Sequence, residues 1–295
     1  MSNMNTRTNS LDGAAGAGPI LTIDNLCLGF GKKKVLDRVS VRFERGEAVL
    51  IAGNNGVGKT SLLRCITGVY LPDSGQVRFA GNLGREKTGM ISDKMSLLES
   101  FTLRQGIDFH CRVFNINHFN DSLIKPLNIN MNQKIRDLSA GERALYHLSL
   151  ILSQEPEILL LDEIIHSIDP YLRELFLEGL IEMIDEFKTT LIMVNHTFSE
   201  MGRIPERILI MEDGRFLLDE KRDDMHRKMK KVITQQKIGG DIPVVFKKET
   251  PVMNEYYVYP FTTDIAKKYD YDFQDVDLTE IIKSFIGGYY AKKRS

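Results

Sequence analysis

The stretch Gly53-Asn54-Asn55-Gly56-Val57-Gly58-Lys59-Thr60-Ser61 decides the fold, because its glycines, lysine and hydroxyls fit the pattern GxxxxGK[ST]. It follows the short apolar run EAVLIAG at 47–53 and precedes SLLRCITGV at 61–69, which has helical spacing. Glycines let a backbone wrap around an oxyanion with successive N–H groups pointing inward, and a helix start adds its positive end. The sequence therefore predicts a strand, a phosphate-binding loop and a helix in succession.

A loop of this kind binds a nucleoside triphosphate, and all nine quoted residues are predicted to contact it. Lys59 is expected to reach the β and γ phosphates, and the Thr60 hydroxyl is expected to coordinate Mg²⁺. The alternative is a glycine-rich turn with a surface lysine. The strand before the loop and the helix after it favour the phosphate site.

A second candidate feature is the run ILLLDE at 158–163, where a buried strand ends in two acidic residues. Asp162 is expected to hold Mg²⁺, directly or through water. Glu163 could orient or deprotonate an attacking water. An apolar strand followed by a polar loop is the alternative. Metal and base are what a phosphate loop lacks for phosphoryl transfer, and this favours the catalytic interpretation.

Strand and helix patterns alternate along the chain and predict an α/β fold with a mostly parallel sheet. Buried strands are expected at 47–53, 157–162 and 189–195, with a helical segment, LRELFLEGLIEMIDEF, between the last two. Alternating apolar residues from Ile20 predict an N-terminal antiparallel β subdomain, and residues 94–137 carry helix-like patches such as SLLESF and Leu103 to Phe114. The run ILIMEDGRFLL at 208–218 predicts a hairpin that turns at Asp213-Gly214.

The composition changes near residue 220, where we expect a domain boundary. The stretch 219–237 is charged and predicted to be helical, and the segment after it is rich in aromatic residues. Tyrosines of EYYVYPF could form a stacking surface for a sugar or base, but packing of a small β unit is the preferred interpretation. We therefore expect a disordered tail at 1–19, a nucleotide-binding domain at 20–220 with a helical subdomain at about 94–155, and an accessory α+β domain at 221–295.

The segment Leu138-Ser139-Ala140-Gly141-Glu142 lies twenty residues ahead of ILLLDE. Ser139 and Glu142 have the S-x-x-E spacing of a capping box, which starts a helix and by itself implies no function. A capped helix start with small residues also leaves N–H groups exposed to an anion. In this position the segment resembles the LSGGQ signature of the ABC-family ATPases.

The resemblance covers residues 20–220 and includes five motifs in the family's order. They are the phosphate loop, the signature, the acidic strand end, SIDP at 167–170 and MVNH ending in His196. Phe30 stands where the family has an aromatic ring that stacks on adenine. The resemblance implies a P-loop fold, an active ATPase, and Mg²⁺ and ATP as its cofactor and substrate.

In that family two ATPase domains pack head to tail, and each ATP lies between one chain's phosphate loop and the other chain's signature. The resemblance implies that Ser139 and Gly141 complete the γ-phosphate site of a partner chain and that Asp169 links the two sites. His196 would hold the γ-phosphate and position Glu163. Hydrolysis would then weaken the interface between the two chains and produce motion.

The chain departs from the family pattern at a few positions. Asp93 stands where a glutamine is expected; it can still ligate Mg²⁺ or water, but it is shorter and adds a charge. Glu142 replaces the final glutamine of the signature and keeps the capping role, and Ile164 replaces the proline that usually follows the acids.

The charge balance of 39 basic against 40 acidic residues argues against a dedicated nucleic-acid binder, so no nucleic-acid partner is expected. No apolar run approaches the ~20 residues that span a bilayer. Members of the ABC family without membrane spans usually power a separate permease. The resemblance therefore implies a cytoplasmic protein that reaches the membrane through a transmembrane permease and works as a homodimer, the preferred arrangement, or beside a different second ATPase subunit.

The segment VDLTEIIKSFIGGYY at 276–290 loosely resembles the closing helix of exporter ATPases, which favours an exporter over an importer. A helix that caps the accessory domain is an equally good interpretation. Two other classes stay open: a soluble ABC ATPase acting in assembly, repair or translation, and a nucleotide-dependent binding module with little turnover. Glu163 argues against the last.

Overall fold

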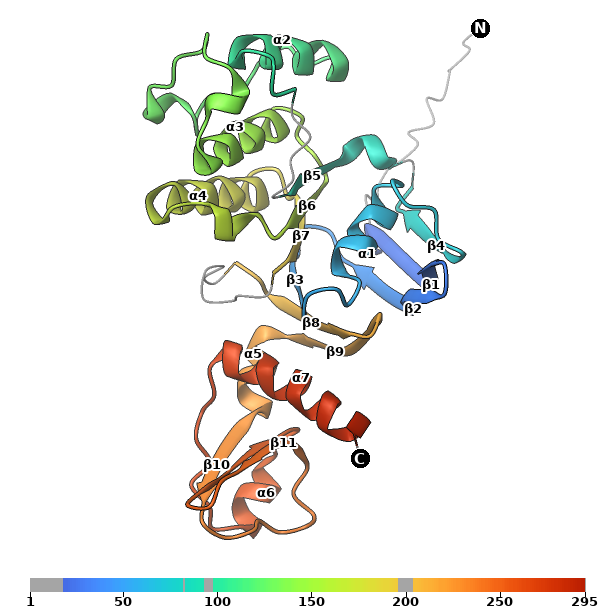
Figure 1. Ribbon diagram of the computed structural model, residues 1–295, viewed down its shortest axis with the longest axis vertical. Coiled ribbons are helices and arrows are strands. Elements are labelled where there is room, and N and C mark those ends of the chain that lie inside the picture. Colours follow the sequence, from blue (N-terminus) through green and yellow to red (C-terminus); the bar gives the residue numbers. More distant parts are fainter. Residues whose placement is uncertain (1–17, 82, 93–97, 196–203, 295) are drawn as a thin grey trace, which may run out of the picture.

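The computed structural model describes residues 18–81, 83–92, 98–195 and 204–294, with the side chains of 292–294 outside the description. A central sheet is covered on one face by helices and on the other by a smaller sheet and a helix, and a separate C-terminal unit lies beyond one edge strand (Figure 1).

The central sheet has six strands in the order β5-β6-β7-β3-β8-β9. The first five are parallel, and β9 pairs with β8 as an antiparallel hairpin. The strands are β5 (Thr88–Ser92), β6 (Ile158–Asp162), β7 (Thr190–Val194), β3 (Ala48–Ala52), β8 (Arg207–Glu212) and β9 (Arg215–Lys221). Every residue of β3, β6 and β7 is buried, as expected of parallel strands covered on both faces.

Alternate residues of the central strands enter two different cores. In β3, Leu50 packs into the core shared with the helices, whereas Val49 and Ile51 pack into the core shared with the N-terminal sheet. This division follows from the two-residue period of a strand. It holds β3, and with it the start of the phosphate loop, rigidly from both sides.

The N-terminal sheet is antiparallel, in the order β2-β1-β4. Its strands are β1 (Leu21–Phe30), β2 (Lys33–Phe43) and β4 (Ser74–Phe79). Helix α1 (Lys59–Ile66) contacts both β2 and β6, so it fills the space between the two sheets. Its side chains Leu62, Leu63 and Ile66 are fully buried there.

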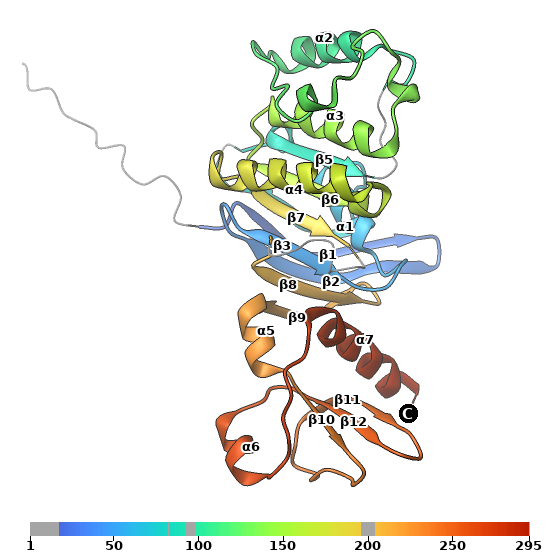
Figure 2. The same ribbon diagram turned by 90° about the vertical axis from the view of Figure 1, so that its left-hand side faces the viewer.

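The helical region lies on the other face of the central sheet, with α3 and α4 packed side by side (Figure 2). Its helices are α2 (Leu103–Phe114), α3 (Ala140–Leu152) and α4 (Pro170–Asp185). The short 3₁₀ turns Lys125–Leu127 and Ile135–Asp137 lie between α2 and α3, the turn Ile164–Ser167 lies between β6 and α4, and a fourth turn, Arg85–Lys87, precedes β5. Tyr146 is fully buried, and its hydroxyl donates to the Leu103 carbonyl at 2.9 Å. This bond ties the start of α2 to the middle of α3.

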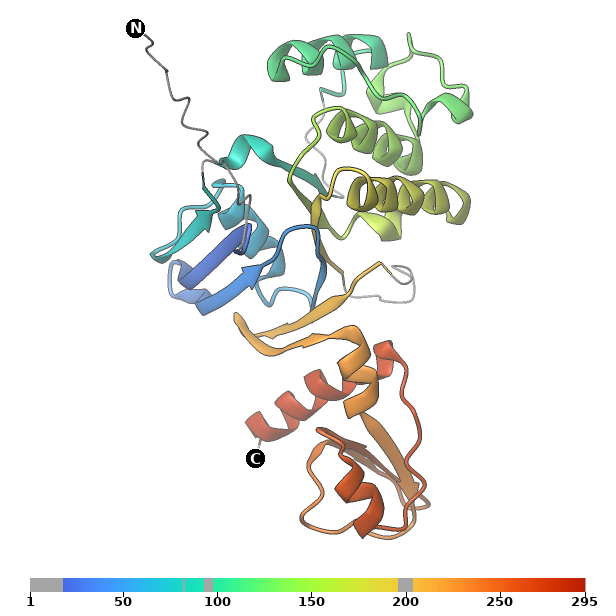
Figure 3. The ribbon, with the colours of Figure 1, turned by 180° about the vertical axis from the view of Figure 1, so that it is seen from behind.

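The C-terminal unit is a three-stranded antiparallel sheet flanked by helices, and it stands apart from the helical region (Figure 3). Its elements are α5 (Arg222–Lys228), β10 (Lys230–Thr234), β11 (Val244–Glu249), β12 (Asn254–Val258), α6 (Thr263–Lys268) and α7 (Leu278–Arg294). Tyr256 and Tyr257 of β12 are buried at 4% and 5% exposure. They pack the sheet, as preferred above, and do not form an open stacking surface.

The predicted α/β fold with a mostly parallel sheet and an antiparallel N-terminal part is confirmed, and so are helix 103–114 and the hairpin at Asp213-Gly214. Two local predictions are wrong. The stretch 219–237 is not one helix, because Lys230–Thr234 pairs with β12 as strand β10. Within SLLESF, none of the described residues 98–101 is helical, because the helix begins only at its cap, Thr102, whose side chain accepts the Gln105 N–H.

Candidate functional site

The glycines of the 53–58 loop occupy positions where a side chain has no room. Gly53 has φ 155°, and a Cβ there would lie 2.1 Å from the Met211 carbonyl oxygen. Gly58 has φ 115°, and its Cβ would lie 2.7 Å from the Val35 carbonyl oxygen. The loop is therefore compressed between β8 and β2, and only glycine fits at these two positions.

Lys59 begins α1 and is only 4% exposed. Its Nζ donates to the carbonyl oxygens of Gly53 and Asn54, both at 2.9 Å, and lies 3.7 Å from Glu163 Oε1. Burial lowers the pKa of the Lys59 ammonium, and the carboxylates of Glu163, Asp162 and Glu212 oppose that shift. The loop thus holds one buried cation among three carboxylates.

The two predicted acids lie beside the loop. Asp162 ends β6, is 5% exposed, and accepts a hydrogen bond from the Thr60 hydroxyl at 2.9 Å. Glu163 has a left-handed backbone with φ 53°, unusual for a glutamate, and its N–H donates to the Val194 carbonyl at 3.0 Å. Strained residues of this kind cluster at functional sites, where the surrounding structure holds them.

A pocket of 320 Å³ opens over the loop. Eight of the residues that the sequence assigned to nucleotide binding or catalysis line this pocket: Phe30, Asn55, Gly56, Gly58, Lys59, Thr60, Ser61 and Glu163. Phe30 is half exposed and packs edge-on against Tyr70, with the ring centroids 5.3 Å apart. The Val57 side chain points into the apolar core instead, and the carbonyls of Gly53 and Asn54 hold the lysine. The pocket thus brings a flat aromatic ring, loop N–H groups, a buried cation and a carboxylate to one opening.

The signature segment folds as a capped helix start. Ser139 Oγ accepts the Glu142 N–H at 3.2 Å, and Glu142 Oε2 accepts the Ser139 N–H at 2.8 Å, so the capping box is present. A Cβ on Gly141 would lie 3.0 Å from Asp169 Oδ2, which places Gly141 and Asp169 side by side. Asp169 itself caps α4 through the Leu172 N–H. Neither Ser139, Gly141 nor Asp169 lines the 320 Å³ pocket as far as the structure describes it.

Asp93 and His196, which sequence reasoning assigned to the metal and the γ-phosphate, lie outside the described residues.

Comparison with known proteins agrees with this geometry. The family model described as ABC transporter matches residues 36–166. A Nod factor export ATP-binding protein from Burkholderia lata is 30% identical over 67% of this chain and 70% of its own length. The chain belongs to the ABC transporter ATP-binding family. Members of this family use ATP with Mg²⁺, and the chain is an ATPase.

Other relatives of this ABC ATPase carry import names. A probable sulfate/thiosulfate import ATP-binding protein from Chlorella vulgaris is 28% identical over 67% of this chain and 89% of its own length. Among solved structures, an ATP-binding subunit of an ABC transporter superposes with a TM-score of 0.63 at 22% identity, over 70% of this chain and 92% of that one. A dimeric ATP-binding cassette, described as a post-hydrolysis state with ADP and phosphate, superposes with a TM-score of 0.59 at 22% identity, over 68% of this chain and 98% of that one. These two structures share the fold.

Several residues of the ABC ATPase site were missed from sequence. Lys33 and Val35 of β2 line the pocket beside Phe30. Glu212 is fully buried, and its Oε1 accepts the Asn54 N–H at 3.0 Å. The available signal was the position of Glu212 at the end of a buried strand, directly before the Asp213-Gly214 turn. Asp162 likewise ends a buried strand.

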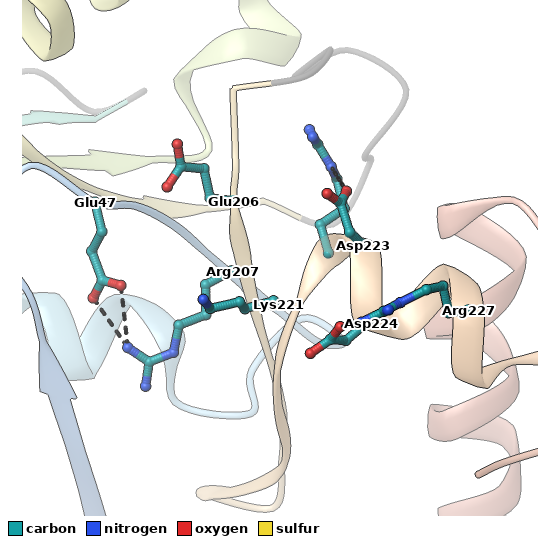
Figure 4. Close-up of a pocket in the computed structure, with 8 residues that line it drawn as sticks. Glu47, Glu206, Arg207, Lys221, Asp223, Asp224 and Arg227 are labelled. Carbon is teal, nitrogen blue, oxygen red and sulfur yellow. Dashed lines mark hydrogen bonds and ion pairs between the residues drawn. The ribbon is translucent and has the colours of Figure 1, made fainter. Parts of the chain in front are cut away.

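A larger cavity of 660 Å³ lies at the end of the sheet away from the phosphate loop, where β3 and β8 begin (Figure 4). Several of its charges pair with one another: Arg207 Nη1 lies 3.0 Å from Glu47 Oε1, and Arg227 pairs with Asp224. Ligands of open α/β sheets bind outside the carboxyl ends of the strands. The smaller pocket over the phosphate loop is therefore the candidate site of this ABC ATPase.

In the part of the chain that the structure covers, no helix combines the length and the apolar character needed to cross a membrane.

Proposed function

We propose that this chain is the ATP-hydrolysing subunit of a membrane exporter, that two copies close on ATP, and that their closure drives a separate permease. The observation that carries the proposal is the grouping of Lys59, the Thr60–Asp162 pair and Glu163 around one pocket. This grouping supplies a phosphate-binding cation, a pair of metal-binding oxygens and a base, which phosphoryl transfer requires.

The loop binds the triphosphate. Lys59 attracts the β and γ phosphates, the loop N–H groups and the start of α1 surround them, and Phe30 stacks on adenine. Because the ammonium already lies at the floor of the loop, it is oriented before the nucleotide arrives. Preorganised donors of this kind stabilise charge at little reorganisation cost.

The residues present fit Mg²⁺. Thr60 Oγ1 and Asp162 Oδ1 are hard oxygen donors 2.9 Å apart, and the Asp162 carboxylate is buried beside the phosphate loop. When bound, Mg²⁺ would neutralise charge on the phosphates. We assign Thr60 and Asp162 to hold it, with Asp93 a further candidate.

Glu163 is assigned as the base that orients and deprotonates the attacking water. Its carboxylate faces the pocket beside Lys59, and its strained backbone fixes the direction of the side chain. His196 is assigned to the γ-phosphate and to the positioning of Glu163.

The second half of each site is assigned to a second copy of the chain. Ser139, Gly141 and Asp169 lie together at two helix starts, yet they do not line the pocket over the loop as described. Ser139 is exposed, so its helix start can meet a phosphate that another copy holds. The dimeric cassette that shares the fold supports this arrangement.

Dimerisation can be tested in a variant that binds ATP without hydrolysing it, by placing a bulky side chain at the signature segment. In a Glu163→Gln background, saturating Mg·ATP is expected to convert the protein to a dimer, as measured by light scattering after gel filtration. Ser139→Arg is expected to abolish this dimer, because a bulky side chain blocks the capped helix start, while ATP affinity of the monomer stays the same. Ser122→Arg, at another exposed serine of the helical region, is the control and should still dimerise. A Glu163→Gln protein that stays monomeric with ATP would refute the homodimer.

The direction of transport is supported by the Nod factor export relative, although import proteins match over a similar share of this chain. The alternative class is a soluble ABC ATPase acting in assembly, repair or translation. A tagged chain purified from detergent-solubilised membranes of its own host separates the two: a transport subunit is expected to bring down one polytopic membrane protein. Recovery of ribosomes or an assembly complex instead would favour the alternative.

A further inference from the structure

The last helix of the C-terminal unit contacts the carboxylate that holds the phosphate loop. Tyr290 lies near the end of α7, and its hydroxyl donates to Glu212 Oε2 at 2.9 Å. The other oxygen of that carboxylate accepts the Asn54 N–H at 3.0 Å. Glu212 is fully buried, so these two contacts fix its position. A continuous chain of hydrogen bonds therefore runs from α7 to the phosphate loop.

A second connection runs through the turn of the β8–β9 hairpin. The Gly214 N–H donates to the Val57 carbonyl at 3.0 Å, and the Tyr289 hydroxyl donates to Asp213 Oδ2 at 3.0 Å. The turn thus contacts the phosphate loop on one side and α7 on the other. The two turn residues that make these contacts, Asp213 and Gly214, directly follow Glu212 in the sequence. Helix α7, the turn and the phosphate loop therefore form one connected unit.

Helix α7 packs against the C-terminal sheet (Figure 3). A Cβ on Gly288 would lie 1.9 Å from the Val245 carbonyl oxygen, so helix and strand β11 are in direct contact. Glu280, near the start of α7, lies 2.7 Å from Lys231 Nζ and accepts the Tyr257 hydroxyl at 2.6 Å. Any displacement of the C-terminal sheet is therefore transmitted to Tyr290.

Glu212 places a negative charge under a loop that binds phosphates. An unneutralised carboxylate there opposes the binding of another anion. The Tyr290 hydroxyl offsets part of that charge, and the same bond raises the pKa of the tyrosine. Without the hydroxyl, the buried carboxylate has one donor fewer and the Asn54 N–H loses a fixed acceptor.

We propose that Tyr290 is a positioning residue that holds Glu212 against the phosphate loop, so that the C-terminal unit sets the affinity of this chain for ATP. The inference rests on the proposed ATP site. A ligand or partner that shifts the C-terminal sheet would separate Tyr290 from Glu212 and weaken ATP binding from a distance.

Tyr290→Phe removes the hydroxyl and keeps the ring. In the full chain we expect the Kd and KM for ATP to rise about fivefold, somewhat less than the whole effect of a hydrogen bond to a charged group. The kcat at saturating ATP should change by less than about twofold, because Glu163 is untouched. Calorimetry gives the Kd, and a phosphate-release assay gives the KM and kcat.

Tyr259→Phe is the matched control. Its hydroxyl donates to Glu220 Oε1 at 2.8 Å, so it also joins the C-terminal unit to the hairpin, but at β9 and away from the loop. We expect its loss to lower thermal stability and leave the Kd for ATP unchanged. If Tyr259→Phe and Tyr290→Phe weakened ATP binding equally, general docking of the unit would explain both effects and the proposal would be wrong.

Glu212→Met provides the double-mutant cycle. With the carboxylate gone, removal of the Tyr290 hydroxyl should cost less than about twofold in Kd, since the two groups act as one unit. An equal cost in both backgrounds would contradict the proposal, and if the Glu212→Met protein does not fold, the pair Tyr290→Phe and Tyr259→Phe decides alone. A wild-type chain that neither binds nor hydrolyses ATP would refute the proposed function itself. An active wild type with a Tyr290→Phe variant indistinguishable from it would refute only this inference.

Discussion

Replacing Glu163 by glutamine is expected to lower the kcat for ATP hydrolysis by about 10² to 10⁴, the usual contribution of a general base. Glutamine has the same shape and can keep the N–H bond to the Val194 carbonyl, so the strained backbone at φ 53° is preserved. What disappears is the ability to accept a proton from water. Phosphate release from purified protein, measured with saturating Mg·ATP, checks the change in kcat.

The same substitution should leave ATP binding intact or strengthen it. Glu163 lies 3.7 Å from Lys59 and lines the pocket, where its charge opposes an incoming triphosphate. Removing that charge relieves repulsion and leaves the lysine free of a competing anion. Glu174→Gln, at an exposed position of α4, is the control and should behave as wild type. Equal turnover in Glu163→Gln and wild type would show that another group activates the water.

The phosphate loop could be read from sequence because its chemistry is local. Glycines, a lysine and a threonine within nine residues, after one buried strand, leave few other structures open. The same applies to Asp162 and Glu163, which follow the apolar residues of one strand. Ligands of open α/β sheets bind outside the carboxyl ends of the parallel strands, so acids at that position are expected near the ligand. Helix 103–114 and the Asp213-Gly214 turn were predicted correctly because helical spacing and a tight turn are each fixed by residues close together in the sequence. The cap at Thr102 was not predicted, and helical structure was therefore also expected before it, in SLLESF.

What sequence could not provide depends on contacts between distant segments. Lys230–Thr234 follows a charged helix, and its lysines suit a helix surface; pairing with β12, more than twenty residues later, makes it a strand. Tyr290 and Glu212 lie 78 residues apart, and no local pattern joins a phenol to a carboxylate. Glu212 resembles a polar residue before a turn until the structure shows it fully buried against Asn54.

Replacing Lys59 by methionine is expected to lower ATP affinity at least about 100-fold, the equivalent of roughly 3 kcal/mol, because charge-assisted bonds to phosphate are lost from a buried position. Methionine retains most of the apolar stem, so the effect reports the ammonium and not a cavity. Calorimetric titration with Mg·ATP measures the change in Kd, and hydrolysis at ordinary ATP concentrations should be undetectable.

The ammonium also has a structural role, which separates this variant from a simple loss of charge. Its bonds to the Gly53 and Asn54 carbonyls hold the loop closed, and leaving both carbonyls without a donor costs about 1–3 kcal/mol each where water cannot reach them. Relief of a buried cation whose pKa is lowered by burial offsets part of this cost. Lys32→Met, at an exposed lysine of the β1–β2 turn, is the control and should keep both ATP affinity and melting temperature. If Lys59→Met still bound ATP as tightly as wild type, the pocket over the loop would not be the triphosphate site. The assignments of Thr60, Asp162 and Glu163 would then fail with it, because each depends on a γ-phosphate held beside this lysine.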